Sequence, residues 1–192
     1  MMCLFDPRRG TADASASAMI KSITEVRPSV RRGVFAGMAA GLFLTIVMTV
    51  MSAAGGKDLW YGIKGAAAPF FGDRVMRPGF DLPPVALGLI AHLVISAGWA
   101  VLFALLFCGT SRLVTIVTGI LWGFVVWIGM YYAVLPVVGL SSMQHDASLG
   151  RAIAFHVLFS GAMTAAYLVY PRLFGDQVNR GGGHLHRAAN AI

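Results

Sequence analysis

Four long stretches of the chain contain no Asp, Glu, Lys or Arg and are apolar almost throughout. These stretches are residues 34–54, 82–108, 113–138 and 152–170. Each is long enough to cross the roughly 30 Å hydrocarbon layer of a bilayer as a helix. Because the apolar residues run continuously and do not alternate with polar ones, the pattern disfavours a β-barrel. It predicts an all-α fold, a polytopic membrane four-helix bundle.

The composition agrees with this pattern. Of the 192 residues, 57% are hydrophobic and only 12% are charged, and the mean hydropathy is +0.74. An average soluble domain is about 25% charged. The chain therefore has too few charged side chains to cover a water-facing surface, which excludes a soluble globular domain.

Lys and Arg are distributed unevenly between the two ends of the predicted helices. Ten of the 15 lie in the tails or the turn between the second and third spans, and five lie in the two longer loops. Loops with an excess of Lys and Arg face the cytoplasm. Both termini are therefore expected in the cytoplasm. The net charge of +7 falls between apolar spans and not in blocks, so we expect contact with anionic lipid and no nucleic-acid binding.

The spans divide the chain into three parts. Residues 1–32 form a basic, partly disordered N-terminal tail, residues 33–171 the four-span domain, and residues 172–192 a flexible C-terminal tail. The first long loop mixes aromatic residues with charges, which is typical of the headgroup region. It predicts a short interfacial helix, broken at Pro69 and Gly72.

The second and fourth spans share a short pattern in which a histidine is followed four residues later by a serine. The pairs are His92 with Ser96 and His156 with Ser160. The similarity indicates two related helical hairpins, residues 33–108 and 113–171, in the same orientation. This would be a parallel repeat about an axis along the membrane normal.

Glycines recur at four-residue steps in two of the spans. They are Gly33, Gly37 and Gly41 in the first span, and Gly119 and Gly123 in the third. Residues four apart lie on nearly the same helix face, so these glycines form stripes that another helix backbone can approach. We expect helix packing within the bundle; a contact between two copies of the chain is the alternative.

His92 and His156 are the candidate site. They are the only side chains in the spans that change charge near neutral pH, and ionisable groups in a bilayer usually face the interior. Ser96 and Ser160 lie one turn away and can hydrogen-bond the imidazoles or their own backbones. The simplest interpretation is that each neutral histidine is a packed polar joint between helices.

Three other interpretations assign the histidine pair a function. It can form a polar pocket for quinone or lipid, or sense protons or pH. It can also hold a b-type haem between the two imidazoles, with Arg151 pairing with a propionate. A metal site is disfavoured because no Asp, Glu or Cys accompanies the pair in the membrane.

The sequence contains no motif of a known catalytic site. It has no P-loop, dinucleotide-binding fingerprint, nucleophile elbow or zinc-protease motif, so an enzyme is not expected. The expected role is binding of another membrane component, which can be a protein subunit, a lipid or a quinone. The expected partners are the bilayer, a membrane protein or a second copy. No cofactor is expected, and haem b is the alternative.

Three short features together resemble the YagU-like group of small bacterial inner-membrane proteins. They are the His-x-x-x-Ser near the start of the second span, the Pro-Val-Val-Gly-Leu of residues 136–140, and the histidine in the fourth span. The resemblance covers about residues 33–171. It implies a four-helix fold in the bacterial inner membrane, and it supplies no activity, substrate or residue role.

Overall fold

The computed structural model describes the backbone of residues 12–139 and 148–189. Side chains are described for residues 26–139, except residue 73, and for residues 148–174. All regular structure in the described residues is helical, which confirms the all-α prediction. The ends of both predicted tails, residues 1–11 and 190–192, lie outside the described residues, so the predicted disorder there stays a prediction.

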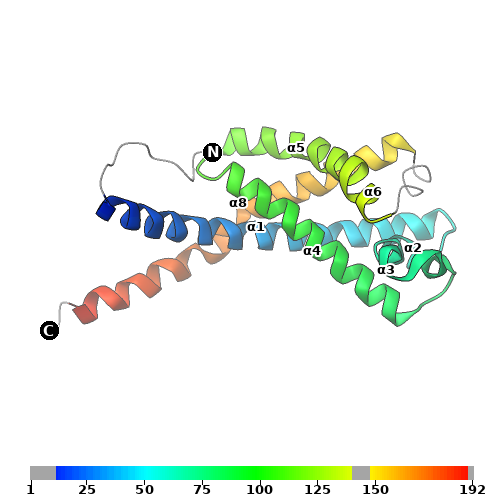
Figure 1. The fold of residues 1–192 in the computed structure, drawn as a ribbon, viewed down its shortest axis with the longest axis horizontal. Helices are drawn as coiled ribbons and strands as arrows, with labels where there is room; N and C mark the ends of the chain where they lie inside the picture. Colours follow the sequence, from blue (N-terminus) through cyan, green and yellow to red (C-terminus); the bar gives the residue numbers. More distant parts are fainter. Residues whose placement is uncertain (1–11, 140–147, 190–192) are drawn as a thin grey trace.

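Four long helical segments dominate the structure (Figure 1). They are α1 (Ala12–Ala54), α4 (Leu82–Leu106), α5 (Arg112–Gly129) with its continuation, and α8 (Leu149–Ala189). Each contains a stretch long and apolar enough to span a membrane: Val26–Ala54, Leu82–Leu106, Arg112–Val137 and Leu149–Phe174. The prediction of a multi-pass, four-helix membrane protein is therefore confirmed.

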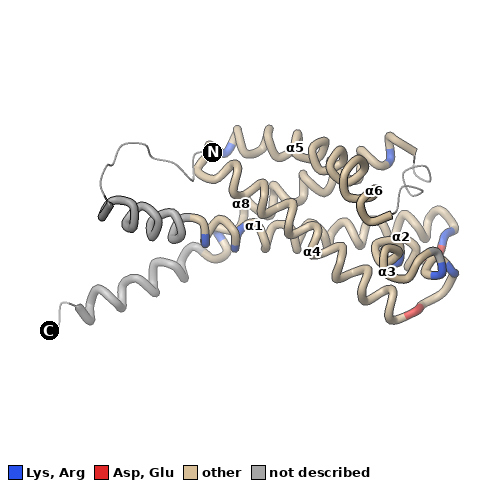
Figure 2. The backbone as a smooth tube through the Cα atoms, in the orientation of Figure 1, with Lys and Arg blue, Asp and Glu red and all other residues tan. Residues whose placement is uncertain are grey.

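The outer surface of the bundle is apolar. Between 22% and 33% of the most apolar part of each span is buried, so most of these side chains face outward. Lys and Arg lie near the two ends of the bundle and leave a long uncharged middle (Figure 2). An apolar belt between two charged rims is the surface that a lipid bilayer covers.

The helices pack unequally around the bundle. α1 lies along both α4 and α8, and α5 lies along α8. In contrast, α4 and α5 contact each other little, although a short turn joins them, and they diverge from that turn (Figure 1). A parallel repeat would match the α1–α8 contact with an equally extensive α4–α5 contact. The packing therefore gives no support to the predicted repeat.

The glycine stripes lie where helix backbones come closest. A Cβ atom added to Gly37 would lie 2.5 Å from the Ser96 carbonyl oxygen and 2.6 Å from the Ala97 Cα on α4. Gly33 and Gly41 face the same helix, and Gly119 and Gly123 face α8. Both stripes thus pack within one chain, and no side chain larger than hydrogen fits at these positions without moving a neighbour.

Aromatic side chains fill the centre of the bundle. Phe103 of α4 is fully buried, and its ring centroid lies 5.8 Å from that of Trp122 on α5 and 5.7 Å from that of Tyr167 on α8. These separations fall in the range preferred by interacting aromatic pairs. Three helices are therefore held together by one aromatic cluster.

The first long loop contains two short α-helices, not one. They are α2 (Tyr61–Gly65) and α3 (Ala68–Phe71), and a 3₁₀ turn covers Gly72–Met76. The predicted break at Pro69 is wrong, because this proline lies in the first turn of α3, where its missing N–H has no helical partner. The predicted break at Gly72 is present, and that residue has a positive φ of 66°.

A buried lysine connects separate parts of this loop. Lys64 is 1% exposed, and its Nζ donates to the carbonyl oxygens of Arg77 at 2.5 Å and Gly79 at 2.9 Å. It also lies 2.7 Å from a carboxylate oxygen of Asp58. The hydrogen bond from Lys64 lowers the pKa of Asp58. A lowered pKa keeps the carboxylate ionised, so this Lys64 clamp persists at neutral pH and is lost only as the pH falls through that lowered pKa.

The helix of the fourth span continues beyond residue 170, the end predicted for this span from the sequence. α8 continues through Pro171 to Ala189. A proline inside a helix leaves the carbonyl four residues earlier, here that of Tyr167, without its N–H donor. The Arg32 side chain of α1 supplies the replacement, since its Nε donates to this oxygen at 2.7 Å. A contact from another helix thus stabilises the proline within α8.

Candidate functional site

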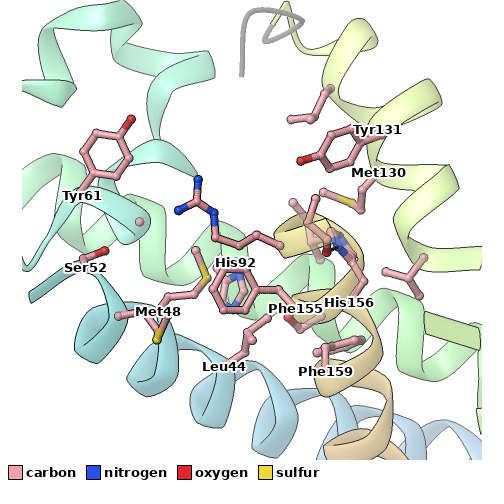
Figure 3. Close-up of a pocket in the computed structure, with 18 of the residues that line it drawn as sticks. Leu44, Met48, Ser52, Tyr61, His92, Met130, Tyr131, Phe155, His156 and Phe159 are labelled. Atoms are coloured by element: carbon pink, nitrogen blue, oxygen red, sulfur yellow. Dashed lines mark hydrogen bonds between the residues drawn. The ribbon is translucent and has the colours of Figure 1, made fainter. Parts of the chain in front are cut away.

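A cavity of about 450 Å³ lies at the end of the bundle that carries the two long loops (Figure 3). Its walls come from the last turns of α1, the middle of α4, the far end of the α5 segment and the first turns of α8. α2 contributes Tyr61 and Gly62 at the loop end. The cavity forms in the half of the bundle where α4 and α5 have diverged, so their side chains no longer fill the centre.

Both candidate histidines line this one cavity, although they come from different helices. His92 of α4 is partly buried, and its Nε2 lies 3.1 Å from the Gly41 carbonyl oxygen of α1. A carbonyl oxygen can only accept a hydrogen bond, so Nε2 donates and the proton of the neutral imidazole lies there. His92 therefore joins α4 to α1 as well as facing the cavity.

His156 of α8 donates its hydrogen bond from Nδ1, whereas His92 donates from Nε2. Its Nδ1 donates to the Ala152 carbonyl oxygen, one helical turn earlier, at 2.8 Å. With the proton on Nδ1, Nε2 of the neutral ring is a hydrogen-bond acceptor. The ring of Tyr131 packs edge-on to this imidazole, with 6.2 Å between centroids.

The other predicted site residues are divided between the cavity and the core. Ser96 and Arg151 line the cavity together with the histidines. Ser160 does not line it: this residue is fully buried, and its Oγ has no hydrogen-bond partner among the described residues. The two His–Ser pairs of the sequence are therefore not equivalent in the structure.

The charge at the cavity is positive. Lys57 and Arg151 line it, both are exposed to solvent, and no Asp or Glu occurs among its described lining residues. The remaining walls are mostly apolar or aromatic, with Leu44, Met48, Trp99, Phe155 and Phe159 among them. Such a site favours a molecule that has an apolar body and a neutral or anionic polar group.

Met130 and Tyr131, which were not predicted as site residues, line the cavity from a π-helical turn (Met130–Val134) that continues α5. Single π turns occur often at functional sites. Pro136 explains this turn. In a regular helix its ring would clash with the carbonyl four residues earlier, and it has no N–H group to donate to that carbonyl. This proline inside an apolar span was the sequence feature that could have indicated the irregular turn.

The wall on the α5 side is held by a specific contact. The indole Nε1 of Trp99 donates to the Met130 sulfur, 3.4 Å away, so the ring spans the opening between α4 and the π turn. A short α6 (Leu135–Val137) follows the π turn. Within the part of the chain that the structure describes, no three His, Cys, Asp or Glu residues lie close enough together to hold a metal ion.

Comparison with known proteins adds no family to this picture. No family model, curated protein or solved structure matches the chain. The resemblance to the YagU-like group therefore has no support beyond the residues quoted for it. The small four-helix membrane architecture is established by the helices themselves.

Proposed function

We propose that this protein is a non-enzymatic membrane protein that binds a quinone in the cavity beside His92 and His156. One observation carries the proposal: an apolar cavity of about 450 Å³ that contains two imidazoles. Small-molecule sites have volumes of roughly 300–1,000 Å³, apolar walls and a few polar groups that orient the ligand. The cavity meets all three conditions.

The polar groups at the cavity suit a quinone or quinol headgroup. The Nε2 of His156 accepts a hydrogen bond and so matches a quinol hydroxyl, whereas Lys57 and Arg151 are donors that match quinone oxygens. A cationic ligand is disfavoured by these two charges. The aromatic walls at Trp99 and Phe155 offer faces for a flat ring.

The packing of the helices supports entry from the bilayer. The backbones of α4 and α5 come close at few positions, although the Trp99 side chain bridges to Met130, and Ile95 of α4 both lines the cavity and is 38% exposed. A ligand dissolved in lipid then reaches the cavity without crossing water. We further propose that the protein resides in a bacterial inner membrane with both termini in the cytoplasm. The excess of Lys and Arg in the tails supports this orientation of the termini.

Quinone binding is expected to quench the fluorescence of Trp99, which lines the cavity. The detergent-purified protein is titrated with a short-chain ubiquinone, and saturable quenching is expected. His156→Ala should weaken binding up to about tenfold, because a hydrogen bond to a partly buried group contributes up to about 1.5 kcal/mol. Ser160→Ala is the matched control, since this residue lies one turn away in α8 but outside the cavity.

Two results would contradict quinone binding. One is quenching that rises linearly without saturation; the other is equal affinity in the His156 variant and the Ser160 control. If mass spectrometry then finds one phospholipid retained per chain, the cavity is a lipid site. If it finds a co-purifying membrane protein instead, the cavity is part of a subunit interface.

Haem b is the second candidate, because both histidines line one cavity. The hydrogen bonds fit it less well. His92 already uses Nε2 on the Gly41 carbonyl, which leaves only Nδ1, close to its own backbone, for an iron. His156 uses Nδ1 on the Ala152 carbonyl, which leaves Nε2 for an iron. The two rings therefore do not present equivalent nitrogens to a shared metal.

The absorption spectrum of the purified protein tests the haem candidate directly. We expect no Soret band from protein produced in haem-replete cells. A Soret band with sharp α and β bands on dithionite reduction, lost in both His92→Ala and His156→Ala, would overturn the quinone proposal in favour of a b-type electron-transfer subunit.

A further inference from the structure

A second cavity, of about 320 Å³, lies at the opposite end of the bundle from the histidines. It is enclosed by α1, the α4–α5 turn with the start of α5, and α8. Three arginines from these three elements line it, Arg32, Arg112 and Arg172, and its described lining includes no Asp or Glu. This arginine pocket shares no lining residue with the histidine cavity.

Arg32 is held in a defined position in the arginine pocket. Its Nε donates to the Tyr167 carbonyl oxygen that Pro171 leaves without a helical partner, and its guanidinium lies 3.7 Å from the centroid of the Tyr167 ring. These contacts use Nε and one face of the guanidinium. The two terminal nitrogens have no partner among the described residues, so their N–H groups are available to a ligand.

Among the residues whose side chains are described, no carboxylate balances the positive charge of this pocket. No ion pair joins Arg32, Arg112 or Arg172 to a carboxylate among the described residues, where the single pair is Lys64 with Asp58. Three like charges around one cavity repel one another unless an anion lies between them. Guanidinium groups bind phosphate oxygens through paired N–H donors, more specifically than an ammonium does.

The depth of the pocket indicates which phosphate it meets. Arg112 begins the third span, and Arg32 and Arg172 lie close to the ends of the first and fourth. All three therefore lie where an apolar span gives way to the headgroup layer. We propose that the arginine pocket binds the phosphate of an anionic phospholipid, and that this lipid joins α1, the α4–α5 turn and α8. The proposal does not depend on what occupies the histidine cavity.

The test compares lipids for their effect on thermal unfolding of the full, delipidated chain in detergent. Phosphatidylglycerol should raise the melting temperature by roughly 5 °C or more, as expected for a ligand well above its dissociation constant. Phosphatidylcholine and inorganic phosphate at the same concentration should not. The triple variant Arg32→Gln, Arg112→Gln, Arg172→Gln should lose the shift.

A second triple variant controls for general charge attraction. Arg27→Gln, Arg31→Gln and Arg74→Gln remove the same net charge from exposed positions outside the pocket and should retain the shift. Because Arg32 packs on Tyr167, the double variant Arg112→Gln, Arg172→Gln is measured as well; it alters only exposed side chains and should weaken the shift by at least half.

Three outcomes would overturn the proposal. Equal loss of the shift in the control variant would show non-specific attraction to a basic protein. An equal shift with phosphatidylcholine would show that the negative headgroup is not recognised. An equal shift with inorganic phosphate would identify a site for a soluble anion and not for a lipid.

Discussion

Gly37→Leu is expected to prevent α1 and α4 from packing and to destabilise the bundle by about 3 kcal/mol. The first added carbon would lie 2.5 Å from the Ser96 carbonyl oxygen and 2.6 Å from the Ala97 Cα. Both obstructing atoms belong to the backbone, so no side-chain rotation relieves the overlap. The expected result is a lower yield of monodisperse protein on size exclusion and a clearly lower melting temperature.

Gly161→Leu is the matched control for this substitution. Gly161 lies in α8, and a Cβ atom added there meets nothing within 4 Å. A leucine at that position should change stability by no more than about 0.5 kcal/mol, as is usual for exposed sites. If both variants unfold at the same temperature, α1 and α4 do not approach as closely as the structure indicates.

Lys64→Met is expected to release the loop between α1 and α4. Methionine preserves the length of the side chain but leaves the carbonyl oxygens of Arg77 and Gly79 without the ammonium that they share. Hydrogen bonds to a charged group contribute about 1.5–3 kcal/mol each, and about 1.4 kcal/mol of lost local stability raises the open fraction tenfold. Trypsin should therefore cleave after Arg74 at least about ten times faster than in the unmodified protein, whereas Arg77 is followed by Pro78 and resists trypsin in both.

Lys57→Met controls for the loss of a positive charge from the same loop. The Lys57 side chain is exposed, and its Nζ lies 4.5 Å from the centroid of the Tyr61 ring. An exposed cation–π contact contributes only about 0.5–1 kcal/mol, so cleavage should accelerate much less. Equal cleavage rates in the two variants would show that Lys64 does not hold the loop closed.

The four spans could be predicted from the chain because the bilayer imposes a length and a polarity on each helix separately. Pro171 marks the limit of such local reasoning. From the sequence it ends a helix, and in the structure α8 passes through it because Arg32, 139 positions earlier, donates to the carbonyl that the proline leaves unpaired. No local pattern contains that contact.

The histidine pair also has one feature that the sequence predicts and one that depends on helix packing. Two imidazoles in apolar helices are expected to face the interior, since exposing them to lipid is costly. The equivalence suggested by the repeated His-x-x-x-Ser is not visible in their contacts. His92 bonds to another helix and His156 to its own, while Ser96 lines the cavity and Ser160 does not.

The all-α architecture, the number of spans and the glycine faces could be predicted from the sequence, because each depends on one segment and its surroundings. Helix packing determines which helices diverge, and therefore where a cavity opens. It also determines that Lys64 is buried with three oxygen partners and that three arginines share one pocket. These features depend on contacts between residues far apart in the chain, and their geometry exists only once the helices are packed.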